Sequence, residues 1–263
     1  MKIKIYQVDA FAERIFTGNP AAVCVLKDEW PDDSLMQNIA MEKNLSETAF
    51  VLNQSGQYHI RWFTPAVEVD LCGHATLASA HVLFSHENFT GEVIKFNSKS
   101  GILSVRKEGD FLTLDFPADK IERIEPARDV LQCFDTFPRE AYKGKTDLLL
   151  VFNREEQISG ILYDIREIKK LNTRGVIITA PGNEVDFVSR FFGPRVGIEE
   201  DPVTGSAHTT LVPYWNGKTG KDEFTARQLS KRGGFLKCRY KGERIEISGK
   251  AKTYLIGEIL DTN

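Results

Sequence analysis

The chain has 263 residues, 41% hydrophobic and 27% charged, which is typical of a globular protein with one or two domains. Its 37 acidic and 34 basic residues give a formal net charge of -3, so no strong basic field is present to hold a nucleic acid. No apolar stretch approaches the ~20 residues that span a bilayer, and the first residues lack a signal-peptide pattern, so we expect a cytoplasmic protein without a membrane partner.

The first part of the chain reads mainly as strands separated by turns. The strands are predicted from runs of β-branched and aromatic residues, at 3–11, 21–26, 48–52, 58–63, 93–96, 102–106 and 111–116. Gly18-Asn19-Pro20 predicts a turn between the first two strands. Ser34 to Lys43 predicts a helix, with Leu35 and Ile39 on its apolar face.

The later part of the chain repeats this pattern of strands, turns and a helix. Residues 147–152 and 175–180 are predicted strands, and 164–171 is a predicted helix between them. Residues 237–248 predict a hairpin, and a closing strand follows at 252–259. Many strands with few helices favour an α+β fold with mostly antiparallel sheets over a doubly wound fold.

A charged stretch with two prolines, residues 117–126, is the predicted linker between two halves. The first half then covers residues 1–116 and the second covers 127–251. The final residues, about 252–263, are expected to pack back on the first half.

The chain also resembles itself. Phe63-Thr64-Pro65-Ala66-Val67 and Phe192-Gly193-Pro194-Arg195-Val196 both read Phe-x-Pro-x-Val. In each half an Asp and a Gly-x-Ala sequence follow, and these open stretches without Lys, Arg, Asp or Glu, at 75–84 and 207–215. A short segment without charge on any face is buried on all sides, so we expect a central helix in each half, wrapped by a curved sheet.

The two helix starts are predicted to face one cleft between the halves. A helix N-terminus offers unpaired N–H groups and partial positive charge, which suit the carboxylate of a small anionic substrate. Proton transfer at carbon needs an acid, a base and donors for an enolate-like intermediate. Candidates for these roles are Glu47, at the start of a predicted strand, and a second group near the helix starts: Asp70, Cys72, His74, Asp201 and Ser206.

Each candidate also has a plain structural interpretation. Glu47 fits a solvated turn, and His74 fits a capping or core histidine. Thr204 and Ser206 are good helix caps by residue type. Cys72 fits a small buried hydrophobe, although a thiol at a helix N-terminus can also act as a base. Residue types alone leave these alternatives open.

Signatures of cofactor sites are absent from the sequence. The four cysteines form no CxxC pair, the five histidines form no HExxH motif, and no phosphate-binding glycine loop occurs. We therefore expect no metal, nicotinamide, flavin or pyridoxal phosphate, and no disulfide framework.

Four segments together resemble the phenazine-biosynthesis PhzF-like family. They are Phe16-Thr17-Gly18-Asn19-Pro20-Ala21-Ala22-Val23, Asn44-Leu45-Ser46-Glu47-Thr48-Ala49-Phe50, Asp70-Leu71-Cys72-Gly73-His74-Ala75-Thr76 and Glu200-Asp201-Pro202-Val203-Thr204-Gly205-Ser206-Ala207. They occur in the family's order and span most of the chain. More distantly, the chain is similar to diaminopimelate epimerases and proline racemases, in which two similar domains each wrap a sheet around a central helix.

The resemblance implies a role for each matching residue. Glu47 matches the family's catalytic acid/base glutamate, and His74, Asp201 and Ser206 match residues that surround the substrate and handle the proton. The resemblance also implies substrate-binding positions, at Asn19, Cys72, Gly73, Thr204 and Gly205.

Two departures from these families limit the transfer. The two-base epimerases use a cysteine from each half, but here only the first half has one, Cys72, and Asp201-Pro202 stands where the second thiol is expected. Gln228-Leu229-Ser230-Lys231-Arg232-Gly233-Gly234 is similar to uncharacterised relatives and differs from the phenazine enzyme. Lys231 and Arg232 fit a solvated turn as well as a carboxylate or partner contact, so the phenazine substrate is not transferred.

The sequence therefore predicts a cofactor-independent isomerase that moves a proton on a small carboxylated metabolite, with a homodimer as its expected assembly. Two alternatives stay open. One is a two-base amino-acid epimerase or racemase, and the other is a non-catalytic relative that binds a metabolite or a protein.

Overall fold

The structure is a computed structural model that describes residues 2–27 and 29–260. Contacts divide the chain into two compact units. The first unit is Met1–Asp115 with Ser248–Asn263, and the second is Phe116–Ile247. The chain therefore passes from one unit to the other twice. No helix among the described residues is long and apolar enough to cross a membrane.

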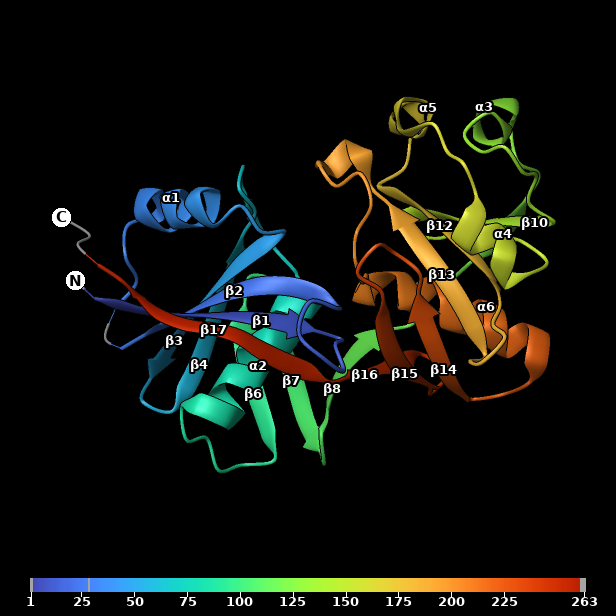
Figure 1. The fold of residues 1–263 in the computed structure, drawn as a ribbon. Coiled ribbons are helices and arrows are strands. Elements are labelled where there is room, and N and C mark those ends of the chain that lie inside the picture. The colour runs from blue at the N-terminus through green and yellow to red at the C-terminus, as the bar shows by residue number, and fades with distance from the viewer. Residues whose placement is uncertain (1, 28, 261–263) are drawn as a thin grey trace. The chain divides into compact units, whose positions relative to one another are not determined.

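Among the residues that the structure describes, nine strands and two helices belong to the first unit; Figure 1 labels them. The strands are β1 (Ile3–Ala10), β2 (Asn19–Leu26), β3 (Glu47–Gln54), β4 (Gln57–Phe63), β5 (Glu68–Val69), β6 (Val93–Ser98), β7 (Gly101–Glu108), β8 (Phe111–Pro117, whose last two residues lie in the second unit) and β17 (Ala251–Ile259). The helices are α1 (Asp33–Lys43) and α2 (Gly73–His86). Pairing gives the order β17-β1-β2-β3-β4-β6-β7-β8, in which β2/β3 and β4/β6 are parallel and the other neighbours antiparallel.

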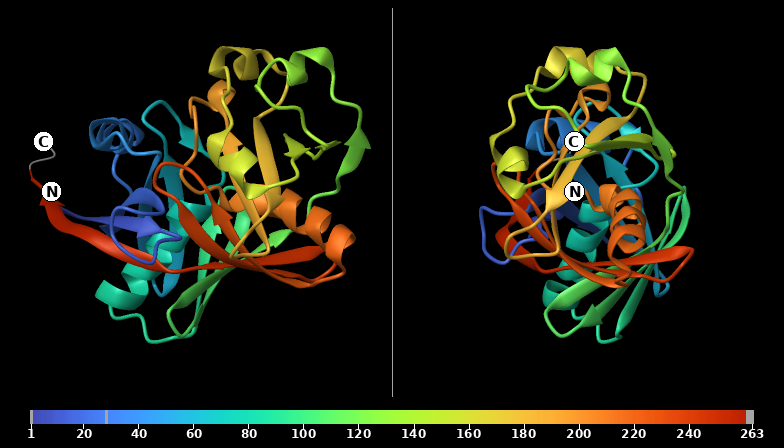
Figure 2. Two further views of the ribbon diagram at one scale, coloured as in Figure 1. Left: turned by 45° about the vertical axis from the view of Figure 1, so that its right-hand side comes forward. Right: turned by 90° about the vertical axis from the view of Figure 1, so that its right-hand side faces the viewer.

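Helix α2 lies against the strands of this sheet, as both views of Figure 2 show. Its interior positions are buried almost without interruption from His74 to Ala80. The uncharged stretch 75–84 is thus a core helix, since a charged side chain on any of its faces would lose its hydration there. Its two polar core residues, Thr76 and Ser79, instead donate to the carbonyls of Cys72 and Ala75 one turn earlier.

The second unit holds the remaining elements. Its strands are β9 (Glu122–Ile124), β10 (Glu140–Lys143), β11 (Asp147–Val151), β12 (Gly175–Pro181), β13 (Phe187–Phe192), β14 (Glu223–Gln228), β15 (Gly234–Tyr240) and β16 (Arg244–Gly249, whose last two residues lie in the first unit). Its helices are α3 (Arg128–Leu131), α4 (Glu155–Gly160), α5 (Ile165–Lys170), α6 (His208–Thr219) and the 3-10 turns η1 (Pro194–Val196) and η2 (Gly205–Ala207). The order is β9-β10-β11-β12-β13-β14-β15, with β11/β12 and β13/β14 parallel.

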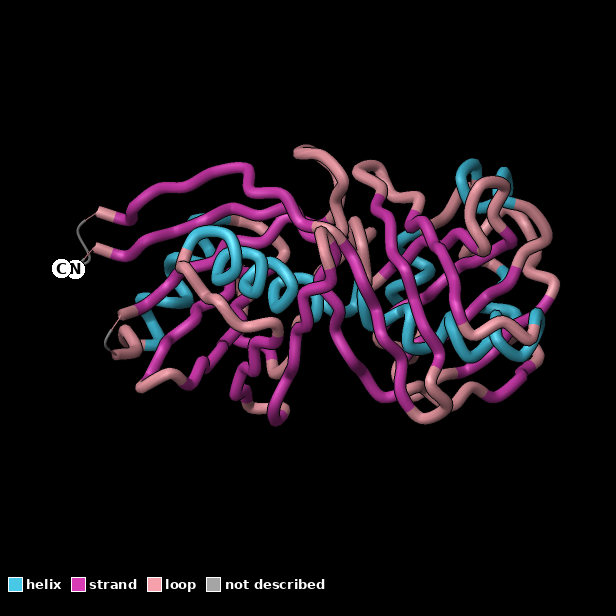
Figure 3. The backbone as a smooth tube through the Cα atoms, turned by 90° about the horizontal axis from the view of Figure 1, so that it is seen from below, coloured by secondary structure: helices cyan, strands magenta, loops and turns pink. Residues whose placement is uncertain are grey.

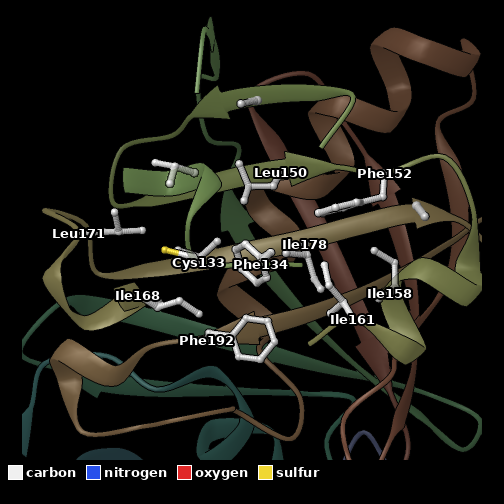
Figure 4. Packing of buried hydrophobic residues seen from close by; sticks show 14 of the residues in the cluster. Cys133, Phe134, Leu150, Phe152, Ile158, Ile161, Ile168, Leu171, Ile178 and Phe192 are labelled. Atoms are coloured by element: carbon white, nitrogen blue, oxygen red, sulfur yellow. The ribbon is translucent and has the colours of Figure 1, made fainter. Parts of the chain in front are cut away.

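An apolar cluster joins the short helices of the second unit to its sheet (Figure 4). Phe134 and Phe192 contact each other with ring centroids 6.0 Å apart, and Ile158 and Ile168 bring α4 and α5 into the same cluster. Burial of these side chains holds together helices of six residues or fewer, which are too short to be stable alone.

The strand order reveals the internal repeat. Pairing alternates antiparallel, parallel, antiparallel, parallel, antiparallel in β1-β2-β3-β4-β6-β7 and again in β10-β11-β12-β13-β14-β15. The central helix connects β4 and β5 to β6 in one unit and β13 to β14 in the other. The predicted α+β class with mostly antiparallel sheets is confirmed.

The first half ends at Asp115, one residue before the predicted boundary, but residues 117–126 do not form a linker. Residues 122–124 form β9, which pairs with β10, and the Ala118 N–H donates to the Glu243 carbonyl at 2.8 Å. The segment is therefore part of the second unit, and its charges are those that suit a short exposed edge strand. The second unit consequently begins at Phe116 and ends at Ile247, where residues 127 and 251 were predicted.

The closing strand packs on the first unit. β17 pairs antiparallel with β1 over the whole strand, from Ile3 opposite Ile259 to Ala10 opposite Ala251, with one irregularity between Gln7 and Val8. Figure 3 shows this long pair of strands running side by side.

Candidate active site

Two strand starts in the first unit place the first polar groups of the site. Asn19 is the first residue of β2 and Glu47 the first of β3. The two strands are parallel, with Ala21 opposite Glu47, so both strands start at the same end of the sheet. Glu47 is only 9% exposed, which rules out the solvated-turn interpretation.

Gly18 makes the approach to Asn19 possible. Its φ of +70° is disfavoured for residues with a Cβ, and a Cβ built there would lie 2.2 Å from the Ala10 carbonyl oxygen. Of the turn predicted at 18–20, only Gly18 precedes the strand, since Asn19 and Pro20 already belong to β2. The close approach at Gly18 places Asn19, which is buried, opposite Ala10.

The start of α2 supplies the next groups. Cys72 is the extended residue before the helix, Gly73 is the first helical residue and His74 the second. His74 Nε2 lies 3.3 Å from Glu47 Oε2. On the other edge of the ring, Nδ1 lies 3.3 Å from Asn19 Nδ2 and 3.5 Å from Cys72 Sγ. The structure thus brings three other predicted residues, Asn19, Glu47 and Cys72, around the imidazole of His74.

These contacts determine the protonation of His74. The Asn19 amide nitrogen carries only donor hydrogens, so Nδ1 accepts from it and the proton of the neutral ring is on Nε2, facing Glu47. His74 is 6% exposed, and burial lowers its pKa to about 3. The ring is therefore neutral near neutral pH.

The same residues form the one candidate metal-ligand group found among the described residues. One ligand atom each from Glu47, Cys72 and His74 lie within 4.8 Å of one another, all buried. A thiolate, an imidazole and a carboxylate together suit a borderline-soft divalent cation such as Zn²⁺. The sequence did not lead us to expect this grouping.

In the second unit, Asp201 and Thr204 form a compact network. The Thr204 hydroxyl donates to Asp201 Oδ2 at 2.5 Å. Gln228 clamps the turn between them: its Oε1 accepts from the Thr204 N–H at 2.9 Å, and its Nε2 donates to the Asp201 carbonyl at 2.7 Å. The Ser230 hydroxyl adds a bond to the Pro202 carbonyl at 2.7 Å. The loop is thereby fixed from the end of β14.

Ser206 has different partners. Its Oγ accepts from Arg174 Nη1 and Nη2, each at 3.2 Å. Arg174 Nε also donates to Asp147 Oδ1 at 2.8 Å, and its Nη2 pairs with Asp147 Oδ2. Asp147 is 2% exposed, so the guanidinium is held from behind by a buried carboxylate.

Neither Thr204 nor Ser206 caps a helix with its side chain. Thr204 precedes the turn η2 without a side-chain capping bond, because its hydroxyl is used by Asp201, and Ser206 is used by Arg174. Gly205 begins that turn. The capping interpretation is therefore wrong for both residues.

The residue of the second unit that is equivalent to Cys72 differs from the predicted one. Both Cys72 and Thr204 directly precede the Gly-x-Ala segment and have extended backbone, so Thr204 is the residue equivalent to Cys72. Asp201-Pro202, predicted to stand there, lies earlier in the loop, and Asp201 reaches the position through its bond with Thr204.

Other sequence candidates lie apart from these networks or were missed. Asp70 is exposed, and Lys231 is exposed in the bend before β15. Sequence reasoning missed Arg174, Asp147 and Gln228. The Asp and Arg stand at the starts of two predicted strands, as Glu47 does, and that shared position is the signal that would have found them.

The chain matches the sequence model of the family described as "Phenazine biosynthesis-like protein" over residues 8–257. The chain belongs to this family. Among its PhzF-like relatives, an uncharacterized isomerase of Pseudomonas aeruginosa is 50% identical, covering 98% of this chain and 99% of the relative. The phenazine biosynthesis-like domain-containing protein of Homo sapiens is 39% identical, covering 98% and 99%.

Solved structures agree with the PhzF-like assignment. A PhzF-family protein from Enterococcus faecalis superposes with a TM-score of 0.96 at 48% identity, covering 98% of this chain and 99% of the other. A hydroxyproline epimerase from Agrobacterium vitis has a TM-score of 0.64 at 10% identity, covering 98% and 92%, which shows a shared fold alone.

Proposed function

We propose that the protein is a cofactor-independent isomerase that transfers a proton on a small carboxylated metabolite, with Glu47 as the proton carrier. The observation that carries this proposal is the buried contact between Glu47 and His74 at the start of α2. A carboxylate this buried, next to a neutral donor, is uncommon outside sites that use it.

Glu47 takes a proton from the substrate carbon and returns it at a second position. His74 Nε2 lies 3.3 Å from the carboxylate, while Asn19 fixes the ring from Nδ1. Because burial keeps the pKa of His74 near 3, the ring orients Glu47 without adding a positive charge that would weaken it as a base.

The helix start supplies stabilisation for the negative intermediate. The N–H groups of Gly73, His74 and Ala75 precede the first intrahelical bond, which runs from the Thr76 N–H to the Cys72 carbonyl at 3.2 Å. Backbone donors and partial positive charge at this end suit a substrate carboxylate or an enolate oxygen.

For two groups of the second unit we propose roles of the same chemical kind. Asp201, bonded to the Thr204 hydroxyl, is the second proton-handling group, and Ser206 is a hydrogen-bond donor to the substrate. Since Oγ of Ser206 already accepts from Arg174, its own proton is directed away from the guanidinium.

Solvent-deuterium uptake tests the proposal directly. The protein is incubated in D₂O with pooled carboxylated metabolites, and mass spectrometry detects compounds that gain deuterium with time. Uptake that also requires Glu47 supports the function, whereas binding without exchange for any pool indicates a non-catalytic relative. A parallel sample dialysed against a strong chelator shows whether a cation at Glu47, Cys72 and His74 takes part.

A two-base epimerase is the second candidate. The observation that favours it is the Cys72 thiol, whose Sγ lies 3.5 Å from His74 Nδ1 and within 4.8 Å of a Glu47 carboxylate oxygen. Loss of chirality in a recovered substrate, without movement of a double bond, distinguishes the epimerase from the isomerase.

A further inference from the structure

A groove of about 420 Å³ lies in the second unit next to Arg174. The residues that line it include two arginines, three other polar residues and no acidic one: Thr146, Asn172, Thr173, Arg174, Arg195 and Val196. A neighbouring groove, at α5 and η1, instead combines Arg166 and Lys169 with Glu199. Only the first of these two grooves thus offers cations without a carboxylate among its lining residues.

Arg174 is fixed in the wall of the groove. The Arg174 Cζ lies over the Phe191 ring, 5.4 Å from its centroid, and Asp147 accepts from two of the guanidinium N–H groups. Two more N–H groups reach Ser206. A guanidinium has five N–H groups, so one on Nη1 is left beyond these bonds for a ligand. The Arg174 side chain is 35% exposed and therefore accessible.

Arg195 is also held in place. It lies in the turn η1, which is closed by two backbone bonds between Gly193 and Ile198, at 3.0 and 3.1 Å. Its Nη1 donates to the Leu171 carbonyl at 2.9 Å, which orients the guanidinium but uses only one of its donors.

The two arginines differ in whether a carboxylate neutralises their charge. Asp147 offsets the charge of Arg174, whereas Arg195 has no carboxylate within ion-pair distance in the described part of the chain. Arg195 thus supplies the uncompensated positive charge and Arg174 supplies a fixed donor. Planar, forked donors of this kind match carboxylate and phosphate oxygens.

We propose that this groove binds an anionic group of a small organic molecule, a carboxylate or a phosphate, between Arg195 and Arg174. Arg174 contacts both Ser206 and the bound anion, and so connects them. That the anion is a second anionic group of the substrate rests on the proposed function, whereas the existence of the binding site does not.

Binding of simple anions tests the site without a known substrate. Malonate, acetate and inorganic phosphate are titrated separately into the full-length protein by isothermal calorimetry at constant ionic strength. Removal of one charge-assisted hydrogen bond typically weakens binding about 10- to 100-fold, so Arg195→Gln should do this for malonate or phosphate. Lys169→Gln, in the neighbouring groove, should leave the affinity unchanged.

The separate titrations show which kind of anion the groove prefers, and the variants show whether the groove or the proposed catalytic function is wrong. Preference for malonate indicates a carboxylate ligand, and preference for phosphate indicates a phosphorylated one. Equal weakening by Arg195→Gln and Lys169→Gln, or no binding by the unmodified protein, overturns the site. Glu47→Gln should bind malonate normally, so loss of exchange with retained binding isolates a catalytic defect from a failure of the groove.

Discussion

Glu47 and Arg174 occupy equivalent places in the two repeats yet carry opposite charges. Glu47 is the first residue of β3, and Arg174 directly precedes β12, the equivalent strand. Each reaches the middle residue of its own Gly-x-Ala segment: Glu47 lies 3.3 Å from His74, and Arg174 lies 3.2 Å from Ser206. The start of the equivalent strand therefore carries a buried carboxylate in one unit and a fixed cation in the other, which fits one principal base rather than two matched ones.

Replacing Glu47 with glutamine should remove exchange while leaving the fold intact. The amide keeps the shape of the side chain but cannot accept the proton, and loss of a general acid/base typically costs about 100- to 10,000-fold in rate. Turnover in D₂O measures the effect. Glu140→Gln is the control, since Glu140 is equally buried, at 9% exposure, but pairs with Lys218. Near-normal exchange by Glu47→Gln would show that another group is the base.

The sequence was most informative where a pattern has a single physical cause. Uncharged stretches predicted the central helices α2 and α6, because only a helix buried on all sides lacks charge on every face. It was least informative at short elements such as α3 and β9, which are formed by tertiary contacts and carry no periodic signal.

The residues of the candidate site likewise fall into those that the sequence predicted and those that only the structure shows. Glu47 and His74 were found because four motifs resemble a family, and residue types alone favoured a solvated turn for Glu47. Arg174 and Asp147 belong to no motif, because their role depends on strand pairing that brings residue 147 opposite 175. Such a pair is visible only after the sheet is known.

Acid should destabilise the protein in part through His74. Its folded pKa is about 3 against an ordinary value of 6.5, so below pH 6.5 the unfolded state binds the extra proton. Its stabilising contribution is present above pH 6.5 and declines toward pH 3, by at most about 1.4 kcal/mol per pH unit for one proton. Urea unfolding at several pH values should show a shallower decline for His74→Asn. An unchanged slope would mean that His74 is already protonated in the folded protein.

Cys72→Ser should keep most of the exchange activity. The thiol contacts His74 Nδ1, and a hydroxyl can replace that contact, so only a mechanism that uses the thiolate as a base would fail. Cys24→Ser controls for the loss of a buried thiol in the same unit. Loss of exchange in Cys72→Ser alone, with Glu47→Gln still active, would favour the epimerase alternative.

Gly18→Ala should destabilise the first unit and displace Asn19. The new Cβ would lie 2.2 Å from the Ala10 oxygen and 2.8 Å from the Ala12 Cβ, at a φ of +70°. Strained backbone of this kind costs about 1–3 kcal/mol before the clash is added. Gly56→Ala is the matched control, because Gly56 also has a positive φ, +84°, but nothing lies within 4 Å of the added atom. Equal losses in urea unfolding would mean that the clash relaxes freely.

Arg174 should act on catalysis through Ser206, so the effects of substituting the two residues should not add. Arg174→Lys keeps a cation beside Asp147 but loses the fork that holds the Ser206 hydroxyl, and kcat at saturating substrate should fall. In Ser206→Ala the hydroxyl is already gone, so adding Arg174→Lys should cause little further loss; coupled neighbours typically show interaction energies of about 0.5–3 kcal/mol. Arg190→Lys is the control, because Arg190 makes the same kind of fork with Glu200 away from Ser206. Its effect should add fully to that of Ser206→Ala. Full additivity of Arg174→Lys as well would show that the arginine stabilises the unit without positioning the hydroxyl.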